Sequence, residues 1–201
     1  MEIRNANYTD VERIVEIHIS AFEGFFLTFL GPNFLHLLYA GFIDKGLLRV
    51  AIVDSNIVGF SAGTDKPEVF FSNLRREKWL TFFFAAAPGL IKKPSLVIKK
   101  LYSAIFYKGD SIERLKNSFL LSSLAVHPCV EGKGIGKHLL KDLEELLSEK
   151  KECQIIYLIT DKNENSSVLS FYSKCGFSIE SEFKQSGQRE MLRLVKSIKV
   201  V

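Results

Sequence analysis

Apolar residues recur along the first third of the chain at spacings that switch between those of strands and those of helices. Thr9 and Asp10 provide a helix N-cap signal, and apolar residues then follow at helical spacing from Val11. The polar residues 54–56 separate two apolar runs and predict a β-hairpin turn. The expected elements are a strand at 1–5, a helix from about 11 to 21, a helix at 32–44, and strands at 48–53 and 57–63.

The last third of the chain alternates the two periods more regularly. The expected elements there are a strand at 118–126, a helix from a glycine-rich turn to about residue 150, a strand at 154–160, a helix at 166–175, and strands at 177–183 and 191–195. Two strand–helix units follow one another, and two antiparallel strands close the chain. This order predicts an α/β (α+β) fold in which helices cover a mixed sheet.

Residues 66–117 interrupt this alternation after the third expected strand. The segment carries 11 Lys and Arg against 4 Asp and Glu, and a helix is expected at 96–107. Pro88, Gly89 and several lysines break its apolar runs well short of the roughly 20 residues that a membrane span needs. We interpret it as a basic, aromatic-rich helical insertion, either packed on the body or forming a surface for peripheral membrane contact or a lipid-linked substrate. Its basic residues match no nucleic-acid recognition motif, so no nucleic acid is expected.

Composition narrows the class of protein. The chain has 201 residues, of which 47% are apolar and 25% charged, which is typical of one globular domain spanning 1–201 and excludes disordered and collagen-like chains. Three cysteines with no short paired spacing indicate neither a disulfide framework nor a zinc site. Because the polar N-terminus lacks the pattern of a signal peptide, we expect a cytoplasmic protein.

The strongest local motif is the glycine-rich run between the strand at 118–126 and the helix that follows. Three glycines at 132, 134 and 136 let the backbone approach a ligand with no Cβ in the way. Their N–H groups and the positive end of the helix dipole suit a phosphate. A dinucleotide-binding fingerprint fails because Lys137 stands where its third glycine belongs, and a P-loop fails because Gly134 follows Lys133.

A second motif lies after the next expected strand, at the same edge of the sheet. Together the two motifs resemble those of the GCN5-related N-acetyltransferase (GNAT) superfamily. The residues that carry the resemblance are Leu124-Ala125-Val126, Glu131-x-x-Gly134-x-Gly136, Asn165-x-x-Val168-x-x-Phe171-Tyr172 and Gly176-Phe177. The chain departs from the family pattern at Glu131, where Gln or Arg is usual, and at Val168, where Ala is usual.

The resemblance implies a mostly antiparallel GNAT-like sheet and acetyl-CoA as cosubstrate, with no metal. It assigns Asn165 to the pantetheine arm and Tyr172 as the general acid that protonates the leaving sulfur. Further cofactor-binding residues that it implies are Leu124, Ala125 and Val126 for the pantetheine and the acyl carbonyl, Glu131, Gly132, Lys133, Gly134, Ile135, Gly136 and Lys137 for the pyrophosphate, and Phe171 in the closing motif.

The general base stays open at this point. Glu23 lies in the loop after the first helix, where this family shapes its acceptor site, and Ser122 lies two residues before Leu124, from where it can relay a proton through water. His18 and His127 are further candidates because histidine is a common catalytic base, and we interpret His18 as a packed or capping residue of the first helix. Cys129 and Cys175 lack an evident activating partner, so direct attack in a ternary complex is favoured over covalent catalysis.

The predicted function is an acyl-CoA-dependent N-acyltransferase acting on a small amine or amino-sugar. One alternative is a catalytically inactive GNAT-like binding module, in which Glu131 weakens coenzyme A binding. Another is an acetyltransferase for a nucleotide-sugar or lipid-linked glycan acceptor, recognised by residues 66–117. The acceptor, the acyl length and the formation of a homodimer stay open.

Overall fold

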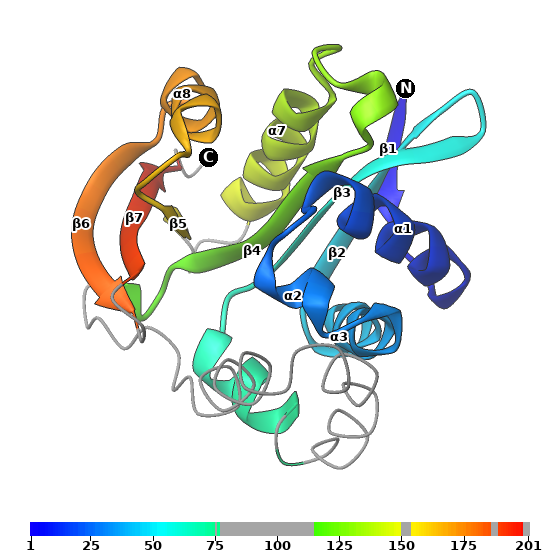
Figure 1. Cartoon of the computed structure of the whole chain (residues 1–201), viewed down its shortest axis with the longest axis horizontal. Helices are drawn as coiled ribbons and strands as arrows, with labels where there is room; N and C mark the ends of the chain where they lie inside the picture. The colour runs from blue at the N-terminus through cyan, green and yellow to red at the C-terminus, as the bar shows by residue number, and fades with distance from the viewer. Residues whose placement is uncertain (75, 77–114, 150–153, 186–188, 199–201) are drawn as a thin grey trace.

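The computed structural model describes residues 1–74, 76, 115–149, 154–185 and 189–198 (Figure 1). Of the basic insertion at 66–117, a helical stretch at 67–74 is described, directly after the third strand. The helix expected at 96–107 and the third cysteine, Cys153, lie outside the described residues.

The described elements follow the expected order, and their ends differ from the expected ones by at most two residues. The first half contains β1 (Glu2–Asn5), η1 (Tyr8–Asp10), α1 (Val11–Ala21), α2 (Phe26–Phe29), α3 (Pro32–Lys45), β2 (Leu47–Val53) and β3 (Asn56–Thr64). The second half contains β4 (Phe119–Val126), η3 (Pro128–Val130), α7 (Ile135–Ser148), β5 (Ile155–Asp161), α8 (Ser166–Lys174), β6 (Ser178–Gln185) and β7 (Arg189–Ser197). The short helix α2 was not predicted.

The described strands form one seven-stranded sheet in the order β1-β2-β3-β4-β5-β7-β6. Neighbouring strands are antiparallel except for β4 and β5, which run parallel. Figure 1 shows β4 between the half of the sheet built from β1–β3 and the half built from β5–β7. The prediction of a mixed, mostly antiparallel sheet flanked by helices is therefore confirmed.

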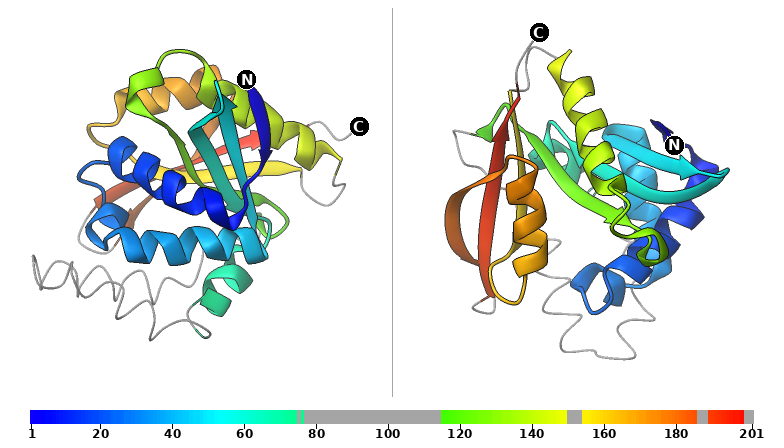
Figure 2. Two further views of the ribbon diagram at one scale, coloured as in Figure 1. Left: turned by 90° about the vertical axis from the view of Figure 1, so that its right-hand side faces the viewer. Right: turned by 90° about the horizontal axis from the view of Figure 1, so that it is seen from above.

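Helices cover both faces of the sheet (Figure 2). On one face, apolar residues of α1 and α3 such as Ile17 and Phe42 pack against Val50 and Phe60 in a fully buried cluster. On the other face, a second cluster joins α7 and α8 to β5 and β7, and its members include Leu140, Leu143, Leu147, Ile156, Leu158, Tyr172, Leu192 and Leu194. A smaller cluster packs Ile135 and Leu139 of α7 against Ala51 of β2 and Val58 of β3, so α7 also contacts the first half of the sheet.

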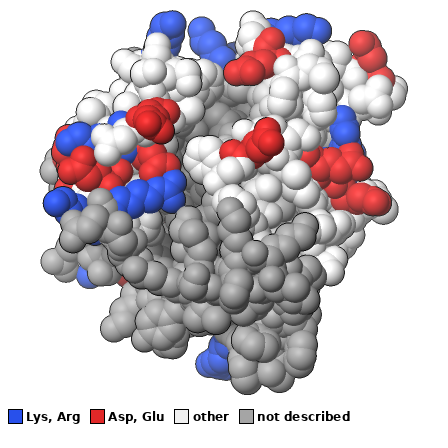
Figure 3. Space-filling view, viewed as in Figure 1, with Lys and Arg blue, Asp and Glu red and all other residues white. Residues whose placement is uncertain are grey.

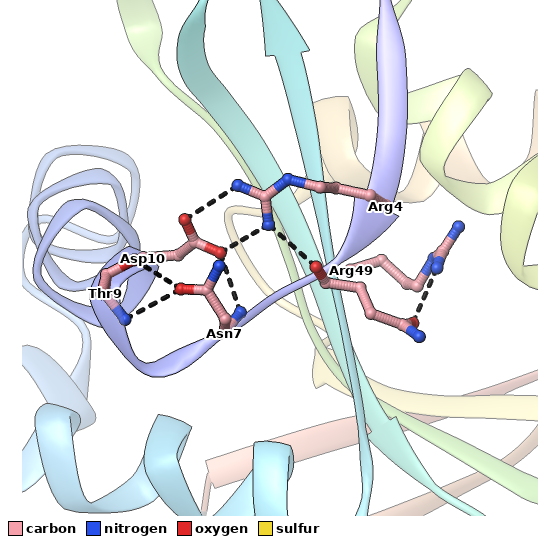
Figure 4. A network of polar contacts seen from close by, with 6 residues as sticks. Arg4, Asn7, Thr9, Asp10 and Arg49 are labelled. Carbon is pink, nitrogen blue, oxygen red and sulfur yellow. Dashed lines mark hydrogen bonds and ion pairs between the residues drawn. The ribbon is translucent and has the colours of Figure 1, made fainter.

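Polar contacts tie the first strand to the rest of the fold (Figure 4). Arg4 donates two hydrogen bonds to the Asp10 carboxylate, at 2.7 and 3.0 Å, and this contact lowers the pKa of Asp10. Arg49 of β2 bonds to Asn5 at 2.7 Å and forms a two-pronged ion pair with Asp142 of α7. Because Arg49 is buried, losing one partner would leave an unpaired charge in the interior.

Charged side chains of both signs intermingle on the surface over β6 and β7, at the left of Figure 3. Lys162 forms ion pairs there with Glu182 at 2.7 Å and with Glu190 at 3.9 Å. Such exposed pairs contribute little to stability, because water and salt screen them. Across the described residues, the search for a helix of the length and apolarity that a membrane crossing requires finds none.

Candidate active site

The site begins where the two parallel strands separate. β4 and β5 pair only at Phe119 with Ile156 and at Leu120 with Tyr157, and beyond these pairs they diverge. A cavity of about 890 Å³ occupies the gap, and residues 121–126 of β4 and 158–161 of β5 line it. We call it the wedge cavity. Divergence leaves backbone groups of both strands without ladder partners inside the sheet.

The direction of these free backbone groups on β4 follows from the pairing with β3. His127 donates its N–H to the carbonyl of Val58 on β3 at 2.8 Å. Since N–H groups alternate in direction along a strand, those of Leu124 and Val126 point away from β3, toward the wedge cavity. Two amide donors, two residues apart, are therefore offered to a ligand between the strands.

A β-bulge distorts β4 at the inner end of the cavity. Ala62 of β3 lies opposite Ser123 and Gly63 lies opposite Leu121, so Ser122 has no partner on β3. A Cβ at Gly63 would collide with the Phe119 ring and the Leu120 carbonyl, which explains the glycine at this position. Ser122 is exposed and lines the wedge cavity.

The glycine loop forms the mouth of the cavity. Gly132 and Gly134 have φ angles of 79° and 77°, in the left-handed region that glycine adopts without strain. No atom lies within 4 Å of a Cβ built on Gly132. The first bond of α7 runs from the N–H of His138 to the carbonyl of Gly134, so helix geometry leaves the N–H groups of 135–137 without helical partners. All three of these residues line the cavity.

Gly136 has a different function from the other two glycines of the loop. A Cβ on Gly136 would lie 3.2 Å from Cζ of Phe171, closer than the ring tolerates without moving. The missing side chain therefore lets α8 pack its Phe171 against the first turn of α7. This contact brings the two predicted motifs together at one cavity.

Asn165 precedes α8 and is buried. Its Nδ2 donates to Oγ1 of Thr160 at 2.7 Å and to the carbonyl of Asp161 at 2.8 Å. Both amide protons are thus bound to the end of β5. What Asn165 can offer to a ligand in the cavity is its Oδ1, which accepts a hydrogen bond from an N–H group.

Tyr172 lies on α8, is 8% exposed and lines the wedge cavity. Its ring packs edge-on against Phe171 and Phe177, at centroid distances of 5.1 and 5.3 Å. Burial raises the pKa of its hydroxyl well above the ordinary value, and the nearby Cys175 adds to this shift. The phenol is therefore uncharged at neutral pH and can donate its proton or a hydrogen bond.

The other site residues predicted from the sequence differ in whether they line the wedge cavity. Glu131 and Val168 are at the cavity wall, and both are exposed. Glu23 and Lys133 are exposed and are not among the described residues that line the cavity. The ring of His127 accepts a hydrogen bond from the N–H of Cys129 at 3.3 Å, which caps η3.

The inner wall of the cavity includes residues that the motifs did not reveal. His18 and Phe22 of the α1 end lie there together with Phe25 and Leu27. Asp161 and Arg189 form a two-pronged ion pair on the opposite wall. The only sequence signal for any of these was the position of His18 on the apolar stripe of its helix, and its predicted packing is confirmed by an exposure of 2%.

Comparison with known proteins finds similarity to acetyltransferases, in part of the sequence and in the fold. Residues 104–177 match the model of the acetyltransferase (GNAT) family. The spermine/spermidine N(1)-acetyltransferase of Bacillus subtilis is 35% identical over 63 residues, which are 31% of this chain and 41% of that protein. The chain therefore spans about two fifths of the length of the curated relatives that it matches.

Solved structures share the fold over almost the whole chain. The ribosomal-protein-alanine N-acetyltransferase from Brucella melitensis superposes with a TM-score of 0.63 at 18% identity, covering 98% of this chain and 100% of that one. An acetyltransferase from Salmonella typhimurium, solved with its cofactor acetyl-CoA, gives a TM-score of 0.61 at 16% identity, covering 99% and 94%. The resemblance carried by the two motifs is confirmed.

Proposed function

From the match of residues 104–177 to the acetyltransferase (GNAT) family, and from the fold that the whole chain shares with its members, we propose that this protein is an N-acetyltransferase that uses acetyl-CoA. The observation that carries the proposal is the wedge cavity, which opens between two parallel strands and has a ring of free N–H groups at its mouth. The acceptor that we propose is a small amine or amino-sugar.

The residues at the mouth fit the phosphate groups of coenzyme A. Open space above Gly132 and the unpartnered N–H groups of 135–137 make a positive concavity suited to a pyrophosphate. Lys137, which is exposed at the same place, adds a positive charge. Further in, Oδ1 of Asn165 is available to an amide N–H of the pantetheine arm.

When bound, acetyl-CoA supplies an activated thioester carbonyl to an attacking amine. The chain's contribution begins with the N–H groups of Leu124 and Val126, which face the cavity. One of them is available to the acyl oxygen and the other to the pantetheine. Fixed amide donors of this kind stabilise negative charge that develops on a carbonyl oxygen, since they need no reorganisation during the reaction.

Tyr172 is the proposed general acid. Because burial keeps its hydroxyl protonated at neutral pH, it can deliver a proton or a hydrogen bond to the departing sulfur. Its ring is fixed by Phe171 and Phe177, so the hydroxyl is held in one place. We propose direct attack in a ternary complex. In its support, the exposed Cys129 is absent from the lining of the cavity, and burial raises the pKa of the Cys175 thiol.

The aromatic side chains that line the cavity support an amine acceptor; they are the buried His18, the half-buried Phe22 and the exposed Phe25. Aromatic faces attract ammonium groups and flat rings alike. The Bacillus subtilis relatives, which are named as spermine or spermidine acetyltransferases, also favour a small amine. Glu23 as base and Ser122 as water relay stay predictions, and the cytoplasmic location and a homodimer stay predictions as well.

One observation favours the inactive binding module as a second candidate. Glu131 places a carboxylate at the cavity mouth, where it opposes a pyrophosphate. The nucleotide-sugar or lipid-linked acceptor was predicted from residues 66–117, most of which lie outside the described residues.

The test is an acetylation assay with acetyl-CoA and three amines, namely spermine, tyramine and glucosamine. Thiol release and the mass of the product are measured together, so that thioester hydrolysis is separated from transfer. We expect at least one amine to gain an acetyl group. Binding of acetyl-CoA without transfer to any of the three, or no binding at all, would contradict an active acetyltransferase and support the inactive module.

A further inference from the structure

One buried polar atom at the inner wall of the wedge cavity has no partner. His18 is 2% exposed, and its Nε2 makes no hydrogen bond to any described residue. Leaving a buried donor or acceptor unpaired costs about 1–3 kcal/mol. Packing alone does not explain a histidine here, because an apolar side chain of the same shape would avoid this cost.

The other ring nitrogen of His18 is firmly engaged. Its Nδ1 lies 2.6 Å from the hydroxyl of Tyr39 on α3, which is completely buried. Burial raises the pKa of Tyr39, and a hydrogen bond with Ser123 of β4 opposes that rise. Ser123 is 7% exposed and, like His18, lines the wedge cavity. Three side chains from three elements therefore form a chain of hydrogen bonds that starts and ends at the cavity.

The charge state of His18 is set by its surroundings. Burial lowers the pKa of its ring to about 4, so the ring is neutral at pH 7. A neutral imidazole with one nitrogen bound to Tyr39 has two tautomers. If Nδ1 carries the proton and donates to Tyr39, then Nε2 is free to accept a proton from a group in the cavity.

Resting on the proposed function, we propose that His18 accepts the proton of the acceptor amine at Nε2 and passes its own Nδ1 proton through Tyr39 to Ser123. The acceptor class is a primary amine that reaches the aromatic wall formed by His18, Phe22 and Phe25. His18 is then a catalytic residue of the acceptor end, and Tyr39 and Ser123 are positioning residues that act through it.

The protons balance at each step. As the N–C bond forms and the C–S bond breaks, the amine nitrogen releases one proton to Nε2. The departing sulfur takes the proton of Tyr172, and water in the cavity returns a proton to the Tyr172 oxygen. The Nδ1 proton moves to the Tyr39 oxygen, the Tyr39 proton moves to the Ser123 oxygen, and the Ser123 proton leaves to water in the cavity. No ion remains on any of the three side chains. After the product departs, the same transfer in reverse, with water in place of the amine, restores the first tautomer.

This route explains how a ring that resists protonation can still act as a base. A simple base would have to become a buried cation, whereas the relay leaves His18 neutral before and after the step. It also accounts for two buried hydroxyls, Tyr39 of α3 and Ser123 of β4, which link the His18 ring back to the cavity.

The experiment uses the full chain with two variants, each with a matched control. His18→Asn has a shorter side chain that can still reach toward Tyr39 but places no atom at Nε2, and Tyr39→Phe removes only the hydroxyl. The controls are His36→Asn on α3 and Tyr157→Phe on β5, neither of which lines the cavity. Three quantities are measured: the acetyl-CoA Kd by calorimetry, kcat and KM for the best of spermine, tyramine and glucosamine, and the ring ¹⁵N shifts of His18.

We expect His18→Asn to lower kcat by at least about 100-fold and Tyr39→Phe by at least about tenfold, with the acetyl-CoA Kd unchanged within about twofold. The double variant should be no slower than His18→Asn alone, because both changes interrupt one relay. Tyr39→Phe should also shift the tautomer ratio of the His18 ring, and the controls should change nothing.

A His18→Asn variant that keeps kcat within threefold of the wild type overturns the relay, and so do losses that multiply in the double variant. A His18 tautomer that ignores Tyr39→Phe overturns it as well. Failure of the proposed function can be told apart from failure of the relay. In that case the wild-type protein would either not bind acetyl-CoA or transfer the acetyl group to none of the three amines.

Discussion

The two ends of the wedge cavity present different chemical groups, backbone groups at one end and side chains at the other. At the mouth, the groups that face a ligand are the backbone N–H groups of 135–137, beside the exposed glycines at 132 and 134. At the inner end, the groups are the buried side chains of His18 and Ser123, held through Tyr39, which lies behind them. One end is made by a short run of sequence and the other by three distant segments.

This difference separates two tasks. Backbone donors recognise a phosphate whatever the acceptor is, and they tolerate change in exposed neighbouring side chains. A buried network of side chains recognises one kind of group and fails when any member is lost. Variation in acceptor specificity is therefore expected at the inner end, while the mouth keeps its cosubstrate.

The largest effect is expected for Tyr172→Phe, which removes the hydroxyl of the proposed general acid on α8. The ring contacts with Phe171 and Phe177 remain, so the protein should fold and bind acetyl-CoA as before. Without the proton donor, kcat should fall on the order of a thousandfold. Steady-state kinetics beside calorimetry measures both, with Tyr157→Phe as the control. An unchanged kcat would remove Tyr172 from the chemistry.

A smaller effect, on stability, tests the burial of His18. The ordinary pKa of the ring is 6.5, and the folded protein lowers it to about 4, so the unfolded chain binds the proton more tightly. The contribution of the neutral His18 ring to the free energy of unfolding is complete above pH 6.5 and is lost as the pH falls toward 4. That loss is about 3 kcal/mol. Denaturant unfolding of wild type and His18→Gln from pH 7 to 4 measures it as the difference between the two proteins. Parallel curves would mean that the ring is not buried in neutral form.

The next effect concerns Asn165, which joins α8 to β5. In Asn165→Asp the side-chain oxygens face the Asp161 carbonyl, where an N–H donor stood. The lost hydrogen bonds and the facing oxygens should destabilise the fold by about 2 kcal/mol. Thermal unfolding at pH 7 tests this against Asn163→Asp, at an exposed position. Equal melting temperatures for the two variants would contradict the bonding described for Asn165.

The smallest effect is a gain at the mouth. Glu131→Gln removes a carboxylate that opposes the pyrophosphate, and acetyl-CoA should bind on the order of fivefold more tightly at low salt. Added salt should reduce the gain by screening. Glu149→Gln, just beyond the far end of α7, makes the same change of net charge and should leave the Kd unchanged. An equal gain in both variants would assign the effect to net charge alone.

The fold could be predicted closely because its signals are local. Helical spacing from Val11, the hairpin turn at 54–56 and the glycine loop each fix an element from a few neighbouring residues. The separation of β4 from β5 was not visible in this way, because it depends on where parallel strands stop pairing. The bulge at Ser122 is set by close contacts of Gly63 with β4, which no spacing encodes.

The site residues differ in the same way: those in local sequence motifs could be predicted, and those brought together only by packing could not. The motif residues Asn165, Phe171 and Tyr172 lie at the cavity with the glycine loop, as the resemblance implied. Glu23 was predicted only from its position in the loop after the first helix. Its side chain is exposed and does not line the wedge cavity. The contact of His18 with Tyr39 joins residues 21 positions apart on two helices, so only the packed structure reveals it.

The most direct test of the account is calorimetric titration of acetyl-CoA into wild type, Gly134→Asn and Gly134→Asp. Both side chains tolerate the left-handed φ at this position better than most, and they differ chiefly in charge. We predict that Gly134→Asn binds within about tenfold of wild type and that Gly134→Asp loses at least about 100-fold, because its carboxylate opposes the pyrophosphate at the backbone donors. Equal binding by the two variants, or no binding by wild type, would contradict a phosphate site at the mouth of the cavity.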